Sequence, residues 1–273
     1  MKRRQFLKAA SVVAATPALY GFHWPFAGEA ARDTLLIAGS DTMTNLTKVL
    51  TSSFTKIQPR LDISVEGGGS SLGLRALMRG AIDVATMSRD LSDPEDITWL
   101  RTFTVARDGL AIVVNKNNPL DDLKLSALAD LFLGKITNWK DVGGPDLPVL
   151  IITAPKTTPR YYNLHDLVID GYDTPKSARM ANTAADTIKE VTSNPGAIGF
   201  LRLKDIDPEL KVLKVNGVTM SKATILSGSY RLTRTFYVTL YREDNDKAQS
   251  FVDYVTGSAG QKVIEEQGYI PVR

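Results

Sequence analysis

The chain has 273 residues, of which 43% are hydrophobic and 23% are charged, so it has the composition of a globular protein with room for one large or two ordinary domains. The formal net charge is +3, and because the first 30 residues carry an excess of basic side chains, the remainder is close to neutral. Nucleic acid and anionic membrane are therefore excluded as the main electrostatic partners. The absence of cysteine removes disulfides, thiol catalysis and cysteine metal ligands.

The N-terminal segment has the pattern of a bacterial export signal. A basic stretch contains the pair Arg3-Arg4, an apolar run follows over residues 9–22, and small residues surround Ala30. This order is typical of a secretory signal, and the arginine pair indicates the twin-arginine form. Thr16-Pro17 interrupts the run, which is shorter than the roughly 20 residues of a spanning helix, so we expect cleavage after Ala30 rather than a retained anchor. Without a cysteine the exported chain is not a lipoprotein, and we expect it to be free in the periplasm.

The first part of the remaining chain alternates strand and helix patterns. Strands are predicted at residues 35–38, 63–65 and 82–85, and helices at residues 43–57 and 72–79, the first of which repeats apolar residues every three or four positions. This order favours right-handed crossovers and a parallel sheet with helices on both faces.

A second α/β set follows the long apolar strand predicted at residues 110–115. We expect a discontinuous lobe 1 at residues 31–113 plus 228–273, a lobe 2 at residues 114–227, and a ligand cleft between them. The further predicted elements are helices at 126–133, 160–169, 184–192, 246–254 and 258–266, and strands at 149–153, 198–200 and 236–241.

Polar loops follow all three strands of the first set. Ligands of parallel sheets collect at the carboxyl ends of the strands, and helix N-termini there offer unpartnered N–H groups to an anion. Hydroxyls and an arginine, whose charged fork suits an oxyanion, would add to those donors. The sequence therefore predicts a site for a tetrahedral oxyanion, with seven candidate residues: Ser40, Thr42, Gly69, Ser70, Ser71, Ser88 and Arg89.

An alternative interpretation exists for each of these residues taken singly. Serine and threonine before a helix are ordinary N-caps, worth about 1 kcal/mol each. Arg89 is close enough in sequence to pair with Asp90 or Asp93 at the surface. The repetition of such loops after three successive strands favours the binding site.

The same loops carry a family resemblance. Residues 39–43, 67–73 and 83–91 resemble the anion loops of the phosphate-binding proteins of ABC transporters. Residues 131–144, around Trp139, look like that family's second-lobe signature. Residues 108–115, 194–200 and 230–234 are similar to it as well, so that the likeness covers nearly all of residues 34–268.

The resemblance implies a two-lobed periplasmic-binding-protein fold of type II that closes over phosphate. It places Thr42, Ser70 and Ser88 where family members contact the anion. It also implies delivery of phosphate to an ABC permease in the inner membrane, a monomeric protein and no cofactor.

The second lobe departs from the family pattern. Family members carry an arginine and then a Ser-Gly-Thr turn at a helix start, whereas residues 153–160 of this chain lack that turn, and Pro159 removes one backbone donor. Thr157, Thr158 and Arg160 are the candidates for replacing the lost donors. The departure leaves open which oxyanion is bound. It also leaves open an alternative function, in which the protein is an anion sensor or a ligand-free interaction protein on the same scaffold.

A hydrolase is another interpretation, because residues 69–73 match the G-x-S-x-G nucleophile pattern with Ser71 as the nucleophile. Such an enzyme needs a later carboxylate and then a histidine. His165 is the one histidine beyond the N-terminal segment, and it stands far from the C-terminus on a predicted helix beside Asp166. We therefore predict a binding protein rather than an enzyme.

Overall fold

The computed structural model describes residues 33–92, 95, 98–241 and 245–272, so the predicted export signal at residues 1–30 lies outside the described residues. The strands are β1 (Asp33–Gly39), β2 (Leu61–Gly68), β3 (Val84–Met87), β4 (Leu100–Asn115), β5 (Asp122–Leu123), β6 (Leu150–Thr153), β7 (Arg179–Met180), β8 (Ala197–Arg202), β9 (Leu210–Val212), β10 (Lys214–Val215), β11 (Thr233–Tyr241) and β12 (Ile270–Pro271). The helices are α1 (Thr44–Phe54), α2 (Ser70–Met78), α3 (Leu125–Phe132), α4 (Pro159–Leu167), α5 (Ala184–Ser193), α6 (Lys222–Leu226), α7 (Asp246–Thr256) and α8 (Ser258–Glu266).

A mixed sheet organises these elements. Its strands follow the order β2-β1-β3-β11-β4-β8-β6-β7, with β9 and β12 also paired to β4. The pairs β1·β2, β1·β3 and β6·β8 are parallel, whereas β4 and β11 run antiparallel to each other and to β8 and β3 respectively. The predicted strand–helix–strand order of the first part is therefore confirmed, with antiparallel strands joining the two parallel sets.

One hydrophobic core, which defines lobe 1, lies where β1, β3, β11, α1, α7 and α8 meet. The predicted apolar face of α1 is buried there, since Leu46, Leu50 and Phe54 are at most 3% exposed. The Phe54 ring packs edge-on against Phe251 of α7 with centroids 5.5 Å apart. Burial of each such side chain stabilises the fold by about 1.5–3 kcal/mol.

A second core, which defines lobe 2, surrounds the buried half of β4 together with α3, α5, β6 and β8. The continuous apolar run at residues 110–114 forms its centre and is fully buried, as expected of a strand covered on both faces. Phe132 packs edge-on against Phe200 at 5.9 Å, and the buried Trp139 donates its indole N–H to the carbonyl of Gly196 at 2.9 Å.

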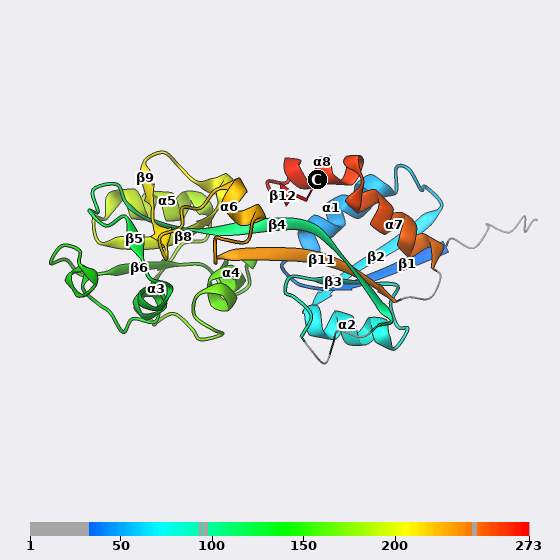
Figure 1. The fold of residues 1–273 in the computed structure, drawn as a ribbon, viewed down its shortest axis with the longest axis horizontal. Coiled ribbons are helices and arrows are strands. Elements are labelled where there is room, and N and C mark those ends of the chain that lie inside the picture. The colour runs from blue at the N-terminus through cyan, green and yellow to red at the C-terminus, as the bar shows by residue number, and fades with distance from the viewer. Residues whose placement is uncertain (1–32, 93–94, 96–97, 242–244, 273) are drawn as a thin grey trace, which may run out of the picture. The chain divides into compact units, whose positions relative to one another are not determined.

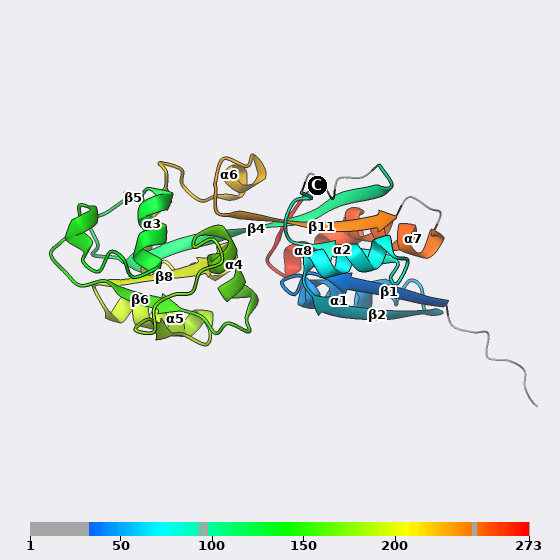
Figure 2. The same ribbon diagram turned by 90° about the horizontal axis from the view of Figure 1, so that it is seen from below.

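Strands β4 and β11 pass side by side from one lobe to the other (Figures 1 and 2). Along β4, Val105 and Ala106 belong to the first core and Leu110 to the second. In the β4·β11 register, Arg234 stands opposite Asp108, within this crossing segment. The two strands therefore place the side chains at residues 108 and 234 beside the junction of the lobes.

The third strand lies two residues later than predicted. Strand β3 begins at Val84, and it includes Thr86 and Met87, which the sequence pattern had assigned to a loop. The reason is tertiary: Thr86 and Met87 pair with Val238 and Tyr237 of the distant strand β11. Local periodicity carries no information about such a partner.

None of the helices in the part of the chain that the structure describes is both long and apolar enough to cross a membrane.

Candidate functional site

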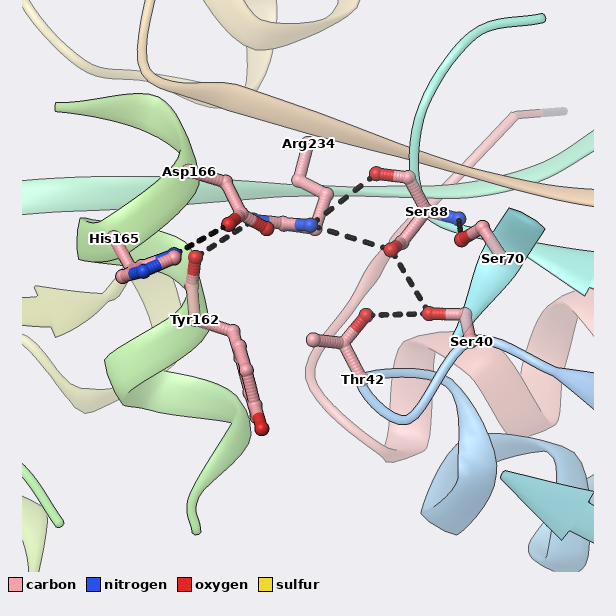
Figure 3. Close-up of polar contacts among 8 residues, drawn as sticks. All are labelled: Ser40, Thr42, Ser70, Ser88, Tyr162, His165, Asp166 and Arg234. Atoms are coloured by element: carbon pink, nitrogen blue, oxygen red, sulfur yellow. Dashed lines mark hydrogen bonds and ion pairs between the residues drawn. The ribbon is translucent and has the colours of Figure 1, made fainter. Parts of the chain in front are cut away.

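The loops that follow β1, β2 and β3 meet at one edge of the sheet. Their hydroxyls form a hydrogen-bonded chain, in which Ser40 Oγ lies 2.8 Å from both Thr42 Oγ1 and Ser88 Oγ (Figure 3). The Ser88 backbone N–H donates to Ser70 Oγ at 3.2 Å. Ser40 and Thr42 are only 2% and 7% exposed, and because buried hydroxyls need partners, the chain fixes their positions. The structure thus brings four predicted residues together.

Glycines allow these loops to approach so closely. Gly39 has φ +144°, and a Cβ added there would lie 2.1 Å from the carbonyl oxygen of Thr86. A Cβ at Gly73 would lie 2.5 Å from Gly39 Cα, so α2 is able to contact β1 only without a side chain there. Gly69, with φ +94°, turns the chain directly into α2.

Arg234 is a residue of the candidate site that the sequence-based prediction did not include. It is 4% exposed, and its Nη1 donates to Ser88 Oγ at 3.2 Å and to the Ser88 carbonyl at 3.3 Å. Its Nη2 donates to the Tyr162 carbonyl at 3.0 Å and to Asp166 Oδ2 at 2.9 Å. Tyr162 and Asp166 belong to α4 (Figure 3), so this one side chain joins the hydroxyl chain of lobe 1 to a helix of lobe 2.

The sequence did hold a signal for Arg234. It precedes Phe236 and Val238 at two-residue spacing, and all three are buried on the same face of β11. A cation among the apolar side chains of a buried strand face costs free energy unless it is paired or binds an anion. Extending the predicted strand from residue 236 back to residue 233 would have exposed this anomaly.

A hollow of about 350 Å³ opens above the hydroxyl chain, facing α4. Its polar lining consists mainly of hydroxyls, glycine backbone and arginines from lobe 1, whereas α4 contributes a tyrosine and a carboxylate. The lining residues are Ser40, Asp41, Thr42, Gly68, Gly69, Ser70, Ser71, Leu72, Arg75, Ser88, Arg89, Tyr162, Asp166 and Arg234. All seven candidates from the first three loops therefore line one hollow.

Arg89 lines the hollow but is already paired with a carboxylate. Its Nη1 and Nη2 donate to the two oxygens of Glu95 at 2.6 Å and 2.8 Å, and Nη2 also donates to Ser71 Oγ at 2.7 Å. The hydrogen bond from Arg89 lowers the pKa of Glu95 to about 2. The sequence offers Asp90 and Asp93 as surface partners for Arg89; within the described residues the carboxylate partner is Glu95, Nη1 also donates to the backbone carbonyl of Asp90, and Asp93 lies outside the described residues.

The three second-lobe candidates lie outside the hollow. Thr158 is the N-cap of α4, accepting from the Tyr161 backbone N–H and donating to the Pro155 carbonyl. Arg160 donates to the carbonyls of Thr183 and Ala181 and to the Thr187 hydroxyl, which ties α4 to the start of α5, and burial lowers its pKa. Thr157 is exposed in the preceding turn.

The residues of the hydrolase pattern have other partners. Ser71 Oγ accepts from the Arg89 guanidinium, which is a donor and does not serve as a general base. His165 lies on α4, as predicted for a helix, with its Nδ1 2.9 Å from Asp166 Oδ1. Within the described residues, no three His, Cys, Asp or Glu side chains gather closely enough to hold a metal ion.

Two lobes joined by paired strands, with a donor-lined hollow at their junction, define a ligand-binding protein of the two-lobed α/β class. Residues 25–259 match the PBP superfamily domain family. The chain therefore belongs to the PBP superfamily.

Individual relatives are similar over nearly their whole length. The phosphate-binding protein PstS of Bacillus subtilis is 28% identical over 89% of this chain and 82% of its own. The crystal structure of an ABC-type phosphate transport receptor from Vibrio cholerae is 30% identical, with a TM-score of 0.77 over 86% of this chain and 99% of that one. A substrate-binding protein from Clostridium perfringens, solved with bound phosphate, is 26% identical with a TM-score of 0.63 over 88% and 100%. The predicted type II periplasmic-binding-protein fold is confirmed.

Proposed function

We propose that this protein binds inorganic phosphate, or a closely related tetrahedral oxyanion, in the hollow and delivers it to an ABC permease of the inner membrane. The observation that carries the proposal is the hydroxyl chain through Ser40, Thr42 and Ser88, which ends on the buried guanidinium of Arg234. The names of the relatives, a phosphate-binding protein and a phosphate transport receptor, support the same ligand.

The hollow offers the donors that a tetrahedral anion requires. The hydroxyls that now bond to one another are able to rotate and donate to an anion instead. The N-termini of α1 and α2 follow the first and second loops and carry partial positive charge. Arg234 adds a charged fork, and charge-assisted hydrogen bonds of this kind are about twice as strong as neutral ones.

Closure of the cleft would proceed about β4 and β11, the strands shared by both lobes. We propose lobe 1 at residues 31–113 plus 228–273 and lobe 2 at residues 114–227. In the closed form α4 would cover the anion with Tyr162 and Asp166, and that form would dock on the permease.

Export would place the protein outside the cytoplasm. We propose that residues 1–30 act as a twin-arginine signal, that the mature chain is a free periplasmic monomer rather than a lipoprotein, and that it serves by binding alone, without catalysis or a cofactor. The relatives are transport binding proteins, which supports this role.

A sensing or ligand-free interaction role on the same scaffold is the second candidate. It is favoured by one observation: Thr157, Thr158 and Arg160, at the start of α4, contribute nothing to the lining of the hollow. Loss of phosphate uptake on deletion of the gene would support transport, whereas unchanged uptake with altered expression of phosphate-responsive genes would support sensing.

Isothermal titration calorimetry of the purified protein with inorganic phosphate tests the proposed ligand directly. We expect saturable one-to-one binding and a raised melting temperature, since a ligand bound only by the folded state stabilises it. Absence of heat and of any thermal shift with phosphate, arsenate and sulfate would falsify the binding function.

A further inference from the structure

A second cavity adjoins the hollow. It has a volume of about 230 Å³ and is lined by residues of α1 in lobe 1 and of α4 in lobe 2, and we call it the side cavity. Thr42, whose hydroxyl belongs to the hydroxyl chain (Figure 3), lines both the hollow and the side cavity. The interlobe cleft therefore continues past the place proposed for the anion.

Two further elements run from the hollow into the side cavity. Arg234 and Phe236 lie two residues apart on the same buried face of β11, and the first lines the hollow whereas the second lines the side cavity. On α4, Tyr162 lines the hollow, and the next residue, Asn163, lines the side cavity. A substituent on an anion held in the hollow would therefore extend into the side cavity.

The side cavity contains a buried amide that lacks a hydrogen bond. Asn163 is 5% exposed, and within the described residues its Oδ1 has no hydrogen-bond partner. A buried acceptor without a partner destabilises the fold, so its presence calls for another explanation. Rotation about the terminal side-chain bond is able to turn either end of the amide toward the cavity. Asn163 is therefore a group whose hydrogen bond a ligand would supply.

The charged groups of the side cavity already have partners. Arg202 Nε donates to Asp108 Oδ2 at 2.6 Å, and the guanidinium lies 4.0 Å from the centre of the Tyr269 ring. Lys204 Nζ donates to the Gln267 carbonyl at 3.3 Å. These contacts hold the walls of the side cavity in place.

The lining defines the chemistry of the substituent. An amide oxygen accepts hydrogen bonds, so a group that pairs with Asn163 Oδ1 must donate one, which neither a carboxylate nor a plain alkyl chain does. Arg202 and Lys204 are two cations against the one carboxylate of Asp108, and they disfavour a positively charged amine. A hydroxyl is neutral, donates to the amide oxygen and is also able to accept from the amide N–H.

We propose that the cleft also binds short hydroxylated phosphate monoesters, with the phosphate group in the hollow and the substituent in the side cavity, where a hydroxyl bonds to Asn163. The inference rests on the proposed function, since the phosphate group occupies the same hollow. The side cavity of about 230 Å³ compares with about 30 Å³ for one water molecule in the liquid, so it accommodates a substituent of the size of glycerol. The ligand class thus extends from inorganic phosphate to its small organic esters.

The test is calorimetric titration with glycerol 3-phosphate, propyl phosphate and inorganic phosphate. Propyl phosphate has the same carbon chain as glycerol 3-phosphate without the hydroxyls. We expect the unaltered protein to bind glycerol 3-phosphate about tenfold more tightly than propyl phosphate, because the alkyl chain leaves the buried amide unpaired. Inorganic phosphate should lower the apparent affinity for both esters, since all three ligands place a phosphate group in the hollow.

Replacing Asn163 separates a binding role from a structural one. Asn163→Leu should lose the preference for glycerol 3-phosphate over propyl phosphate. It should also raise the melting temperature, because an apolar side chain of similar size replaces a buried amide without a partner. Asn163→Ala is a second variant that should lose the preference. Asn117→Leu is the matched control at an exposed position outside both cavities, and it should keep the preference.

The possible results separate the two proposals. Binding of inorganic phosphate with equal affinity for the two esters, with no ester binding, or with a preference unchanged in both Asn163 variants overturns the role of the side cavity and leaves the proposed function standing. Ester binding that inorganic phosphate does not weaken overturns it too, because the esters then bind elsewhere, and so does a loss of preference in Asn117→Leu. No binding of inorganic phosphate or of either ester overturns the proposed function, and this inference with it.

Discussion

In lobe 1, the hydroxyls of Ser40, Thr42 and Ser88 bond to one another across separate loops and face a shared hollow. In lobe 2, Thr158 caps its own helix and Arg160 bonds to the start of α5. Both regions are strand-to-helix loops rich in polar residues. In lobe 2 the polar groups bond within the local fold, whereas in lobe 1 they line the hollow.

The two regions also differ in whether they supply a positive charge to the hydroxyl chain. The guanidinium that reaches the hydroxyl chain comes from Arg234 on β11, a strand shared by both lobes, and not from the loop at the start of α4. Arg234 is therefore in contact with both lobes at once. An anion bound to Arg234 would therefore be linked to α4 through the hydrogen bonds that Arg234 donates to Asp166 and to the Tyr162 carbonyl.

Replacing Arg234 should produce the largest effect on binding. We expect Arg234→Gln to weaken phosphate binding about 100-fold, because a buried charged donor is lost from the hollow. Arg234→Lys keeps the positive charge but lacks the planar fork of donors, so its phosphate affinity should lie between those of the unaltered protein and Arg234→Gln. Calorimetric titration provides the measurement, and an unchanged dissociation constant in Arg234→Gln would remove the residue from the site.

Replacing Arg160 should affect stability and not binding. Arg160→Ala removes two hydrogen bonds to backbone carbonyls and one to the Thr187 hydroxyl, so we expect the free energy of unfolding to fall by about 2 kcal/mol. The phosphate dissociation constant should stay within about twofold of the original. Urea unfolding measures the first quantity and calorimetry the second. A marked loss of affinity with little loss of stability would instead make Arg160 a ligand.

A matched pair of small truncations sharpens the comparison of the two loops. Ser88→Ala should weaken phosphate binding about tenfold, since it removes a hydroxyl in contact with both Ser40 and Arg234. Thr157→Ala removes a hydroxyl from the exposed second-lobe turn and should leave affinity unchanged. Equal losses in the two variants would show that the loop before α4 reaches the anion after all.

The smallest expected effect concerns the acid stability that Glu95 provides. Arg89 holds the pKa of Glu95 at about 2, below its value in an unfolded chain, so the pair stabilises the fold above about pH 4.5 and that stability is lost as the pH falls toward 2. In this window the unfolded state binds more protons than the folded one. Between pH 5 and pH 2 the melting temperature of Glu95→Gln should therefore fall less than that of the unaltered protein. Parallel melting curves for the two proteins would contradict the assignment.

The local pattern was sufficient for much of the architecture. The apolar spacing of Leu46, Leu50 and Phe54 identifies the buried face of α1, and the unbroken run at residues 110–114 identifies a strand covered on both faces. Both signals arise within one element, where the periodicity of side chains follows from backbone geometry alone. The same holds for the three polar loops, because parallel strands with short loops bring their carboxyl ends together.

What the sequence by itself determined is thus the order of the elements, the family resemblance and the set of residues that could meet an anion in lobe 1. Only the tertiary structure decided the partners of the arginines. Arg89 bonds to Glu95, Arg160 to the start of α5, and Arg234 to the hydroxyl of Ser88. The physical reason is the reach of an arginine side chain, which allows partners many residues apart in sequence, so its role depends on which acceptors folding brings within about 3 Å.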